Sequence, residues 1–573
     1  MTSVSHGKPC AGNPHARFEE GASAPESPRR NALLHNRKMK VMLAGLLAAV
    51  SMQAFAATMY TNEVNGIKWV YTLSGGKATL GGGNSSTPAI AGNPSGKVEI
   101  PSALGETPVV AIASYAFSGK TGIKDLTVPN SVTNIGNYAF QNCSSVTNLV
   151  IAKGTQYIGY GAFGGCASLE SLTVPFVGKR RGNDGLTEAL FGYMFGNNSS
   201  QGSRQIRQYY GSSSSYNYYI PTNLVNVVVT DETKIGYGAF YGCEDLCSVT
   251  IGDGVTAIGT YAFYNCSRLE DVTLPDSVKS IDSTAFNGCA ALNYDTTTVP
   301  GLKLIDGWVA GYTSQLNGAV DLTNVRGLVG EAVFKNCPGI TELIVPGTME
   351  TIPDNAFYGC TNLVWVTLAE GVRSIGKSAF YGCAKLQTIN IPSSLTNSGE
   401  SAFYNCTKLS NVSAADLTSW FGIKFGNGDA NPVRYAQVLR VNGEPVVDLV
   451  VPGNVTRIKN HAFYYDYGLR SITMHDGVID VEKSAFCNCG GVTNVAFSSG
   501  LTNIALYAFY ECTNISEVVL NEGLRSIGDY AFQGGGGTAY GFLAKYTHLF
   551  GFCRVYPLHE SKSYLCRWCD SDS

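Results

Sequence analysis

Apolar and polar residues alternate in a phrase that recurs with a fixed period along much of this chain. In the unit LEDVTLPDSVKSIDSTAFNGCAAL, Leu269 to Leu292, the apolar positions up to Leu274 predict a short strand with one buried face. Pro275 predicts the end of that strand, because proline cannot donate to a ladder of backbone hydrogen bonds. The rest of the inward face is supplied by Val278, Ile281, Ala285, Phe286 and Cys289.

The phenylalanine of the Ala-Phe position marks the phase of the repeat. It occurs as Phe117, Phe140, Phe163, Phe240, Phe263, Phe286, Phe334, Phe357, Phe380, Phe403, Phe463, Phe486, Phe509 and Phe532. Ten of the 13 intervals between these residues are equal to the interval from Phe117 to Phe140. Such a period is typical of solenoids, in which each unit buries its apolar side by stacking on its neighbours. The sequence therefore predicts one long solenoid of the leucine-rich-repeat type, with short parallel β-strands and about 23 residues per turn.

Four features of the unit point to one kind of leucine-rich repeat. They are proline after the strand, Ile-Gly or its equivalent, the Ala-Phe pair, and cysteine three residues after the phenylalanine. This combination resembles the BspA-like leucine-rich repeats of host-associated bacteria and some mucosal protists, over roughly Val98 to Gly534. The resemblance implies a surface protein that adheres to host or microbial proteins. Because repeat motifs encode stacking, a ligand site is expected in the variable outward positions.

The remaining segments divide the chain further. Residues 57–97 predict a β-rich cap, which the first turn of a solenoid needs. The repeats occupy residues 98–534 with an insertion at 176–220, and the longer intervals predict a degenerate repeat around Trp308 and a hairpin at 441–447. Residues 535–573 lose the repeat phase, so this irregular tail is either an unusual terminal segment or a sign that the sequence is truncated or out of frame.

Residues 1–56 predict processing and export. NRKMK is followed by the apolar run VMLAGLLAAV and by a small-residue site at Ala54-Phe55-Ala56. A start at Met39 would give a Sec-type signal peptide of normal length, with a polar leader in front of it and cleavage near Ala56. About 10 apolar residues are too few to span a bilayer, which needs about 20. We therefore expect a secreted or cell-surface protein that is not an integral membrane protein.

Charge argues against one class of partner. The chain has 40 Lys and Arg residues against 43 Asp and Glu residues, for a formal net charge of −3. Without residues 1–56 the numbers are 33 and 40, or −7. No basic excess is present to neutralise a phosphate backbone, so a nucleic-acid partner is not expected.

The cysteines follow the repeat. Eleven of the 17 lie three residues after the phenylalanine, and Lys120, Asp466 or Gly535 takes that position in three other units. Stacked turns would bring these cysteines about 5 Å apart, close enough in principle for disulfides. A regular column of identical residues also fits buried free thiols that act as small hydrophobic groups, and this is the interpretation we prefer.

No motif supports catalysis, a metal or a cofactor. CEDLC at 243–247 and CNC at 487–489 lack a second ligand pair at defined spacing. The Asp, Asn and Gly residues after the strands could suggest calcium ligands, but no carboxylate recurs at a fixed position, so surface turns are expected. No nucleophile and base pair or nucleotide-binding fingerprint occurs, and we expect no enzyme activity.

The insertion at 176–220 is the strongest candidate for a binding surface, and we expect it to project from the solenoid. It has five basic residues against two acidic ones and six tyrosines. Tyrosine and arginine are favoured at contact surfaces, because both give large contact areas with polar groups. The alternative is a Gly- and Ser-rich outgrowth whose tyrosines pack on the edge of the solenoid. The candidate binding residues are Arg180, Arg181, Arg204, Arg207, Tyr209, Tyr210, Tyr216, Tyr218 and Tyr219.

Two functions remain open from the sequence. The first is an exported, non-catalytic recognition or adhesion protein that binds proteins or other surface ligands through its solenoid. The second is a structural or spacer protein of the cell envelope without a specific ligand. A long patch of exposed aromatic residues would favour recognition, whereas uniformly polar outward positions would favour the spacer.

Overall fold

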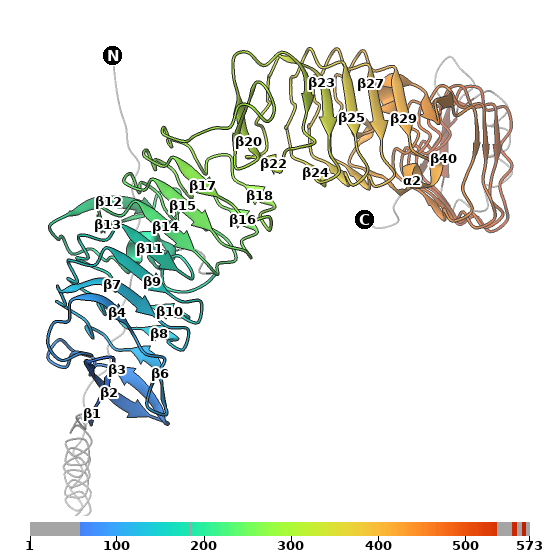
Figure 1. The fold of residues 1–573 in the computed structure, drawn as a ribbon. Coiled ribbons are helices and arrows are strands. Elements are labelled where there is room, and N and C mark those ends of the chain that lie inside the picture. Colours follow the sequence, from blue (N-terminus) through green and yellow to red (C-terminus); the bar gives the residue numbers. More distant parts are fainter. Residues whose placement is uncertain (1–57, 183–185, 536–552, 558–563, 569–573) are drawn as a thin grey trace, which may run out of the picture. The chain divides into compact units, whose positions relative to one another are not determined.

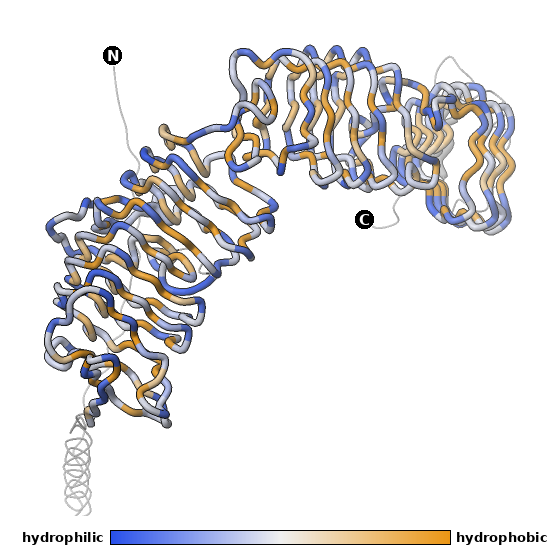
Figure 2. The backbone as a smooth tube through the Cα atoms, in the orientation of Figure 1, coloured by the Kyte–Doolittle hydropathy of each residue, from blue (hydrophilic) through white to orange (hydrophobic). Residues whose placement is uncertain are grey.

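A computed structural model describes residues 58–182 and 186–535, and the strands β40 (Cys553–Pro557) and β41 (Tyr564–Trp568). The main part is a parallel β-solenoid of about 19 turns with about 23 residues per turn (Figure 1), which confirms the predicted fold class. Apolar positions recur at the same place in successive turns (Figure 2). The expected leader, the signal peptide and most of the tail lie outside the described residues.

The chain before the repeats forms the β-rich cap. Strands β1 (Met59–Val64), β2 (Ile67–Ser74) and β3 (Lys77–Leu80) pair antiparallel in sequence order. Strand β3 then pairs parallel with β6 (Thr107–Ile112), which also forms a small hairpin with β5 (Ala103–Leu104). The antiparallel strands thereby join the first parallel turn, and Trp69 of β2 is buried beside Phe117, with ring centroids 6.3 Å apart.

Each regular turn contributes one strand to a main parallel sheet. Successive strands pair in register, so that Leu126, Leu149 and Leu172 follow one another on the inward face. A first sheet contains β4 (Gly96–Glu99), β7 (Ile123–Val128), β9 (Asn148–Ile151), β11 (Ser171–Val174), β14 (Asn226–Val229), β15 (Ser248–Ile251) and β17 (Asp271–Thr273). A second contains β21 (Gly318–Asp321), β23 (Ile340–Val345), β25 (Trp365–Leu368), β27 (Thr388–Ile391), β29 (Asn411–Ala414), β31 (Leu439–Val441) and β32 (Glu444–Pro445). A third contains β33 (Asp448–Val450), β35 (Ser471–Thr473) and β37 (Asn494–Ala496).

A second ladder of two-residue strands runs through the Ile-Gly positions. The residue after the isoleucine donates its N–H to the carbonyl one turn earlier, as from Gly159 to Ile135 at 2.8 Å. The strands of this ladder are β8 (Asn134–Ile135), β10 (Tyr157–Ile158), β16 (Ala257–Ile258), β18 (Ser280–Ile281), β24 (Thr351–Ile352), β26 (Ser374–Ile375), β28 (Asn397–Ser398), β30 (Lys424–Phe425), β34 (Arg457–Ile458), β36 (Asp480–Val481), β38 (Asn503–Ile504) and β39 (Ser526–Ile527).

The phenylalanines stack in a column inside the solenoid. All 14 are at most 7% exposed. Rings in neighbouring turns lie nearly parallel, as for Phe240 and Phe263 at 5.1 Å and 5°. The phenylalanine N–H also donates to the alanine carbonyl of the next turn, at 2.7 Å from Phe240 to Ala262. The Ala-Phe pair is therefore repeated because one residue stacks and the other accepts a backbone hydrogen bond.

The backbone around this pair explains a further regularity of the sequence. The residue two positions after each repeat phenylalanine is left-handed, with φ of 58° at Asn142 and 76° at Gly165. Glycine and asparagine adopt this conformation at the least cost. Twelve of the 14 units have Gly or Asn there, and Tyr465 and Glu511 are the exceptions. The Asn-Cys and Gly-Cys pairs of the repeats therefore occur because the residue before the cysteine must adopt a left-handed backbone conformation.

The eleven repeat cysteines form a column of free, buried thiols, which agrees with the preferred interpretation. In nine of them Sγ donates to the carbonyl oxygen of the phenylalanine one turn earlier, at 2.9 to 3.3 Å. The two others, Cys243 and Cys337, are the first after an irregular interval. Burial raises the pKa of the Cys360 thiol to about 12, so this donor keeps its proton at neutral pH.

An aspartate takes the thiol position in one turn. The Asp466 carboxylate is fully buried and accepts hydrogen bonds from Leu439 N at 3.2 Å and Gly468 N at 2.9 Å. Burial raises its pKa to about 7. The turn before it is the irregular interval between Phe403 and Phe463, with α2 (Leu417–Gly422), η3 (Gly428–Ala430) and α3 (Val433–Ala436). The Asp466 carboxylate thus accepts one hydrogen bond from the irregular turn, at Leu439, and one from its own turn, at Gly468.

The main parallel sheet is interrupted between β17 and β21. The intervening residues include β19 (Leu302–Ile305), β20 (Trp308–Tyr312) and β22 (Gly327–Leu328), which form a small mixed sheet. The two large clusters of buried apolar residues both include residues of this region. The short ladder continues by one step into it, because Gly330 N donates to Ile281 O at 2.7 Å. The degenerate repeat expected around Trp308 contains the hairpin of β19 and β20, and its Tyr312 stacks on Phe334 with ring centroids 6.3 Å apart.

The thiol column gives the first testable prediction. Labelling of the purified, folded protein with iodoacetamide without reductant should leave the eleven repeat cysteines unmodified, because their side chains are buried and the reagent cannot reach them. Labelling in concentrated guanidinium chloride without reductant should modify them all, as peptide mass spectrometry would show. Disulfide-linked peptides between repeat cysteines in the second sample would contradict a reduced column.

Candidate functional site

The insertion lies between two strands that pair with each other. Strand β11 ends at Val174, and β14 begins at Asn226 and pairs with it in parallel register, Leu172 opposite Val227. The main sheet therefore passes the insertion without a break. All residues between these strands belong to one enlarged turn.

Part of the insertion replaces a regular turn. Residues 187–194 form η1 (Thr187–Ala189) and η2 (Phe191–Met194), and Phe191 N donates to Ala239 O at 2.9 Å. The Phe195 ring lies 6.1 Å from Phe163, and Phe191 lies 4.8 Å from Phe240. These two rings contact each other at 5.3 Å and so bridge the phenylalanine column across the insertion.

The rest of the insertion is a hairpin of β12 (Ser203–Tyr209) and β13 (Ser215–Pro221). Two buried polar side chains fix its position, Gln208 against the solenoid and Tyr218 against the first part of the insertion. Gln208 accepts from Gly192 N at 2.7 Å through Oε1 and donates to Tyr241 O at 3.1 Å through Nε2. Tyr218 is 0% exposed, and its hydroxyl donates to Thr187 O at 2.8 Å. The insertion is therefore docked along the edge of the solenoid, and our expectation that it projects as a whole is corrected.

The candidate arginines divide into two groups. Arg204 pairs with Glu244 at 2.6 Å and Asp245 at 3.3 Å, and Arg181 pairs with Asp231, so these two fasten the insertion to acidic residues of the solenoid. Arg180 and Arg207 are exposed and make no ion pair with any residue that the structure describes. Within the described part of the chain, only the second group could bind a partner without loss of an ion pair.

The candidate tyrosines also differ in accessibility. Tyr218 is buried, Tyr209, Tyr210 and Tyr219 are half-buried, and Tyr216 is 37% exposed. Burial raises the pKa of the Tyr218 hydroxyl. The packing alternative therefore holds for Tyr218, whereas the other four keep part of their surface in solvent.

The structure adds four tyrosines that the sequence analysis missed. Tyr209 of the hairpin lies 4.8 Å from Tyr241, which lies 4.9 Å from Tyr264. Tyr241 and Tyr264 both contact Tyr261, which contacts Tyr237 at 5.6 Å. We call this group the tyrosine patch: Tyr209, Tyr237, Tyr241, Tyr261 and Tyr264. The available signal was the tyrosine directly after the repeat phenylalanine in two consecutive units.

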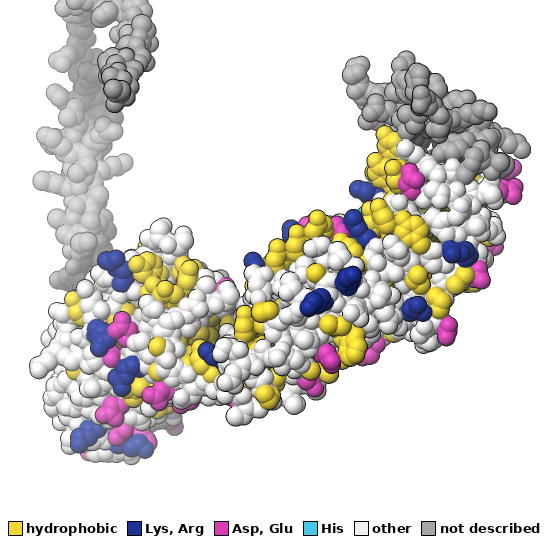
Figure 3. Space-filling view, turned by 90° about the horizontal axis from the view of Figure 1, so that it is seen from above, with side chains coloured by type: hydrophobic (Ala, Val, Ile, Leu, Met, Phe, Trp, Pro, Cys, Tyr) yellow, Lys and Arg dark blue, Asp and Glu magenta, His cyan; other side chains and the backbone are white. Residues whose placement is uncertain are grey.

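The rest of the described residues offer few further candidate sites. No group of three His, Cys, Asp or Glu side chains among the described residues could hold a metal ion. Helices long and apolar enough to cross a membrane are absent from the same residues. On the face drawn in Figure 3, cationic and anionic side chains are interspersed.

Comparison with known proteins places these features in a family. A BspA type leucine rich repeat region matches in six copies, over residues 98–183, 212–315, 328–424 and 442–539, which is more than half of the chain. This chain belongs to the BspA-type leucine-rich repeat family. BspA-type proteins are leucine-rich repeat proteins, and this class is generally non-catalytic.

Solved structures similar to this BspA-type chain include two bacterial proteins. A leucine rich cell surface protein from Faecalibacterium prausnitzii is 21% identical, covers 77% of this chain and 95% of its own, and has a TM-score of 0.25. A leucine-rich repeat protein from Bacteroides ovatus is 22% identical, with 83% and 92% covered and a TM-score of 0.22. The search of curated proteins finds no match.

Because the insertion is docked, we expect its deletion to destabilise the solenoid. Removing residues 178–219 takes Phe191 and Phe195 out of the column, and loss of one buried phenylalanine costs about 3 to 5 kcal/mol. We expect Phe191→Ala to lower the free energy of unfolding by about this amount in urea titrations. The control Arg207→Ala, at an exposed site, should change it by less than about 0.5 kcal/mol. Equal stability of Phe191→Ala and the wild type would show that the insertion is not part of the core.

Proposed function

We propose that this BspA-type chain is an exported, non-catalytic recognition protein that binds proteins or other surface ligands, of host or microbial origin, through its solenoid. The observation that carries the proposal is the tyrosine patch beside the docked hairpin. Five aromatic rings in contact on one edge, all partly exposed, supply the large and rigid contact area that binding surfaces use.

The hairpin supplies the polar part of the proposed surface. Arg207 and Tyr209 lie on β12, and Arg207 is paired across the hairpin with Asn217, next to Tyr216. Arg207 is exposed and has no ion pair with a described residue, so a carboxylate of a partner could bind it without displacing another group. Arg180, Tyr210 and Tyr219 belong to the same proposed surface.

The spacer alternative has support on another face. The outward positions of the first main sheet include Asn148, Ser171, Asn226 and Ser248, which stand opposite one another in successive strands. Small polar side chains in this column offer a partner no aromatic anchor. We therefore assign recognition to the edge with the hairpin and the tyrosine patch, and we assign no ligand to this part of the sheet.

A comparison of captured proteins tests the assignment. The chain from residue 57 onward would be immobilised and incubated with surface-biotinylated extracts of epithelial cells and of bacteria, and bound proteins would be quantified by mass spectrometry. We expect the triple variant Arg207→Ala, Tyr216→Ala, Tyr264→Ala to lose bound proteins at least tenfold. The control Ser171→Ala, Ser248→Ala should retain them. A wild type that captures no more than an empty resin would support the spacer function instead.

Export forms a separate part of the proposal. The basic, apolar and small-residue segments at 36–56 support a Sec-type signal with a start at Met39, and hence a secreted or cell-surface location. Expression from Met39 in a bacterial host should give an extracellular or periplasmic protein, and N-terminal peptide mass spectrometry should place its first residue near Ala57. Retention in the cytoplasm with residues 39–56 still attached would contradict it.

A further inference from the structure

A groove of about 1610 Å³ lies where the short-strand ladder is interrupted. One wall comes from β16 and β18, and the other comes from the residues before and after β24. Trp308, Val329 and Val333 are among the residues between these walls. The groove is therefore lined both by turns before the interruption of the main sheet, at β16 and β18, and by a turn after it, at β24.

A proline keeps the ladder open at this place. In regular turns the residue after the isoleucine donates its N–H to the preceding turn, as Gly376 does to Ile352 at 2.9 Å. Pro353 holds this position in its turn and has no N–H to donate. Val329 precedes Ile352 by one period, and no hydrogen bond to its carbonyl is found among the described residues. The groove thus contains a backbone acceptor that the fold leaves unsatisfied.

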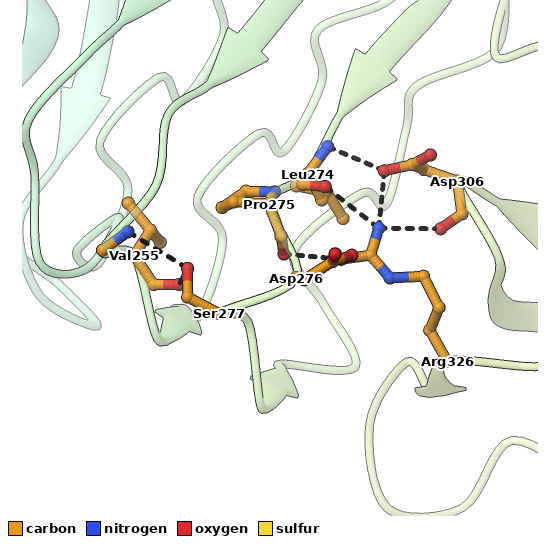
Figure 4. Close-up of polar contacts among 8 residues, drawn as sticks. Val255, Leu274, Pro275, Asp276, Ser277, Asp306 and Arg326 are labelled. Atoms are coloured by element: carbon orange, nitrogen blue, oxygen red, sulfur yellow. Dashed lines mark hydrogen bonds and ion pairs between the residues drawn. The ribbon is translucent and has the colours of Figure 1, made fainter. Parts of the chain in front are cut away.

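The arginine at this place is already bound by its own chain (Figure 4). Arg326 Nη1 donates to Leu274 O at 3.0 Å and to Asp306 Oδ2 at 2.8 Å, and Nη2 donates to Pro275 O. Asp306 Oδ2 also accepts from Leu274 N at 2.8 Å. Where the main sheet is continuous, the segment after the next strand supplies such partners, as Thr230 and Asp231 N–H do for Val174 and Pro175 O. Arg326 and Asp306 thus replace a missing strand and fix one wall of the groove.

The groove is rich in acceptors and poor in free cations. Its charged lining residues are five acids and two bases, a formal charge of −3: Asp276, Asp282, Glu331, Glu350, Asp354, Lys279 and Arg326. Because Arg326 is bound to Leu274 and Pro275, just after β17, Lys279 is the one remaining cation among these lining residues. Trp308 is 3% exposed, and its Nε1–H has no acceptor among the described residues. A polypeptide could satisfy both kinds of group, with a backbone carbonyl for Trp308 and cationic side chains for the carboxylates.

We propose that this groove binds an extended, lysine- or arginine-rich segment of a partner protein. Its cationic side chains pair with Glu331 and with Glu350, whose own pair with Arg373 is long at 3.8 Å and exposed, and they donate to the open Val329 carbonyl. The proposal rests on the recognition function but uses a surface separate from the hairpin and the tyrosine patch. It also adds the chemistry of the partner, which those aromatic residues do not specify.

A synthetic peptide provides the probe. A labelled decapeptide of alternating lysine and valine would be titrated against the chain from residue 57 onward by fluorescence anisotropy, with alternating glutamate and valine as the anionic control. We expect binding of the lysine peptide alone, weakened at least tenfold by Glu331→Gln with Glu350→Gln. The control pair Glu517→Gln with Glu522→Gln removes the same charge at exposed positions of the last turns and should leave the affinity unchanged.

A steric variant separates the groove from general charge attraction. Ala332→Trp places a large side chain at a lining position without changing any charge, and we expect it to weaken peptide binding at least tenfold. Circular dichroism of each variant would check the fold. Absence of peptide binding, or equal weakening by both glutamine pairs, would overturn the proposal. The triple variant of Arg207, Tyr216 and Tyr264 should bind the peptide normally, so failure of the proposed recognition edge would not be mistaken for failure of this groove.

Discussion

Each turn of this solenoid buries its apolar side only against the two turns beside it, and the rest of the structure depends on that constraint. The phenylalanine column, the two strand ladders and the cysteine column all run from one turn to the next. Stability is therefore close to a sum of unit and neighbour contributions. Any departure from the regular period must rebuild these contacts locally, as Phe191 and Phe195 do within the insertion.

The period made the fold predictable to a large extent. Buried positions such as Leu274 and Phe286, the strands and the direction of stacking follow from one repeated pattern, because the same environment recurs in each unit. The Gly or Asn before the thiol was equally visible in the sequence, but its cause is a backbone angle that composition alone does not reveal. Asp466 shows the same limit, since its buried acceptor role depends in part on a donor from an irregular turn.

The candidate site was predicted less well, because it depends on contacts between segments far apart in sequence. A high content of Tyr and Arg identified the insertion, but it could not separate Tyr218, which is buried, from Tyr216, which is exposed. Nor could it show that Arg204 is paired with acids of a later repeat while Arg207 remains exposed. The tyrosine patch combines the hairpin with two later repeats, so no single segment contains its signal.

The equal register of regular turns also bears on how such a chain can change in evolution. A turn such as that from β25 to β27 keeps one register with the turns on both sides, Leu343 opposite Val366 and Val366 opposite Ile389. Unequal recombination that adds or removes the codons of one whole turn there would leave every remaining neighbour contact in place. The turns around Arg326 lack this freedom, because Arg326 and Asp306 complete a strand that lies far earlier in the sequence, at Leu274 and Pro275. The length of the regular part can therefore vary by whole turns, while the interruption is inherited only as one block.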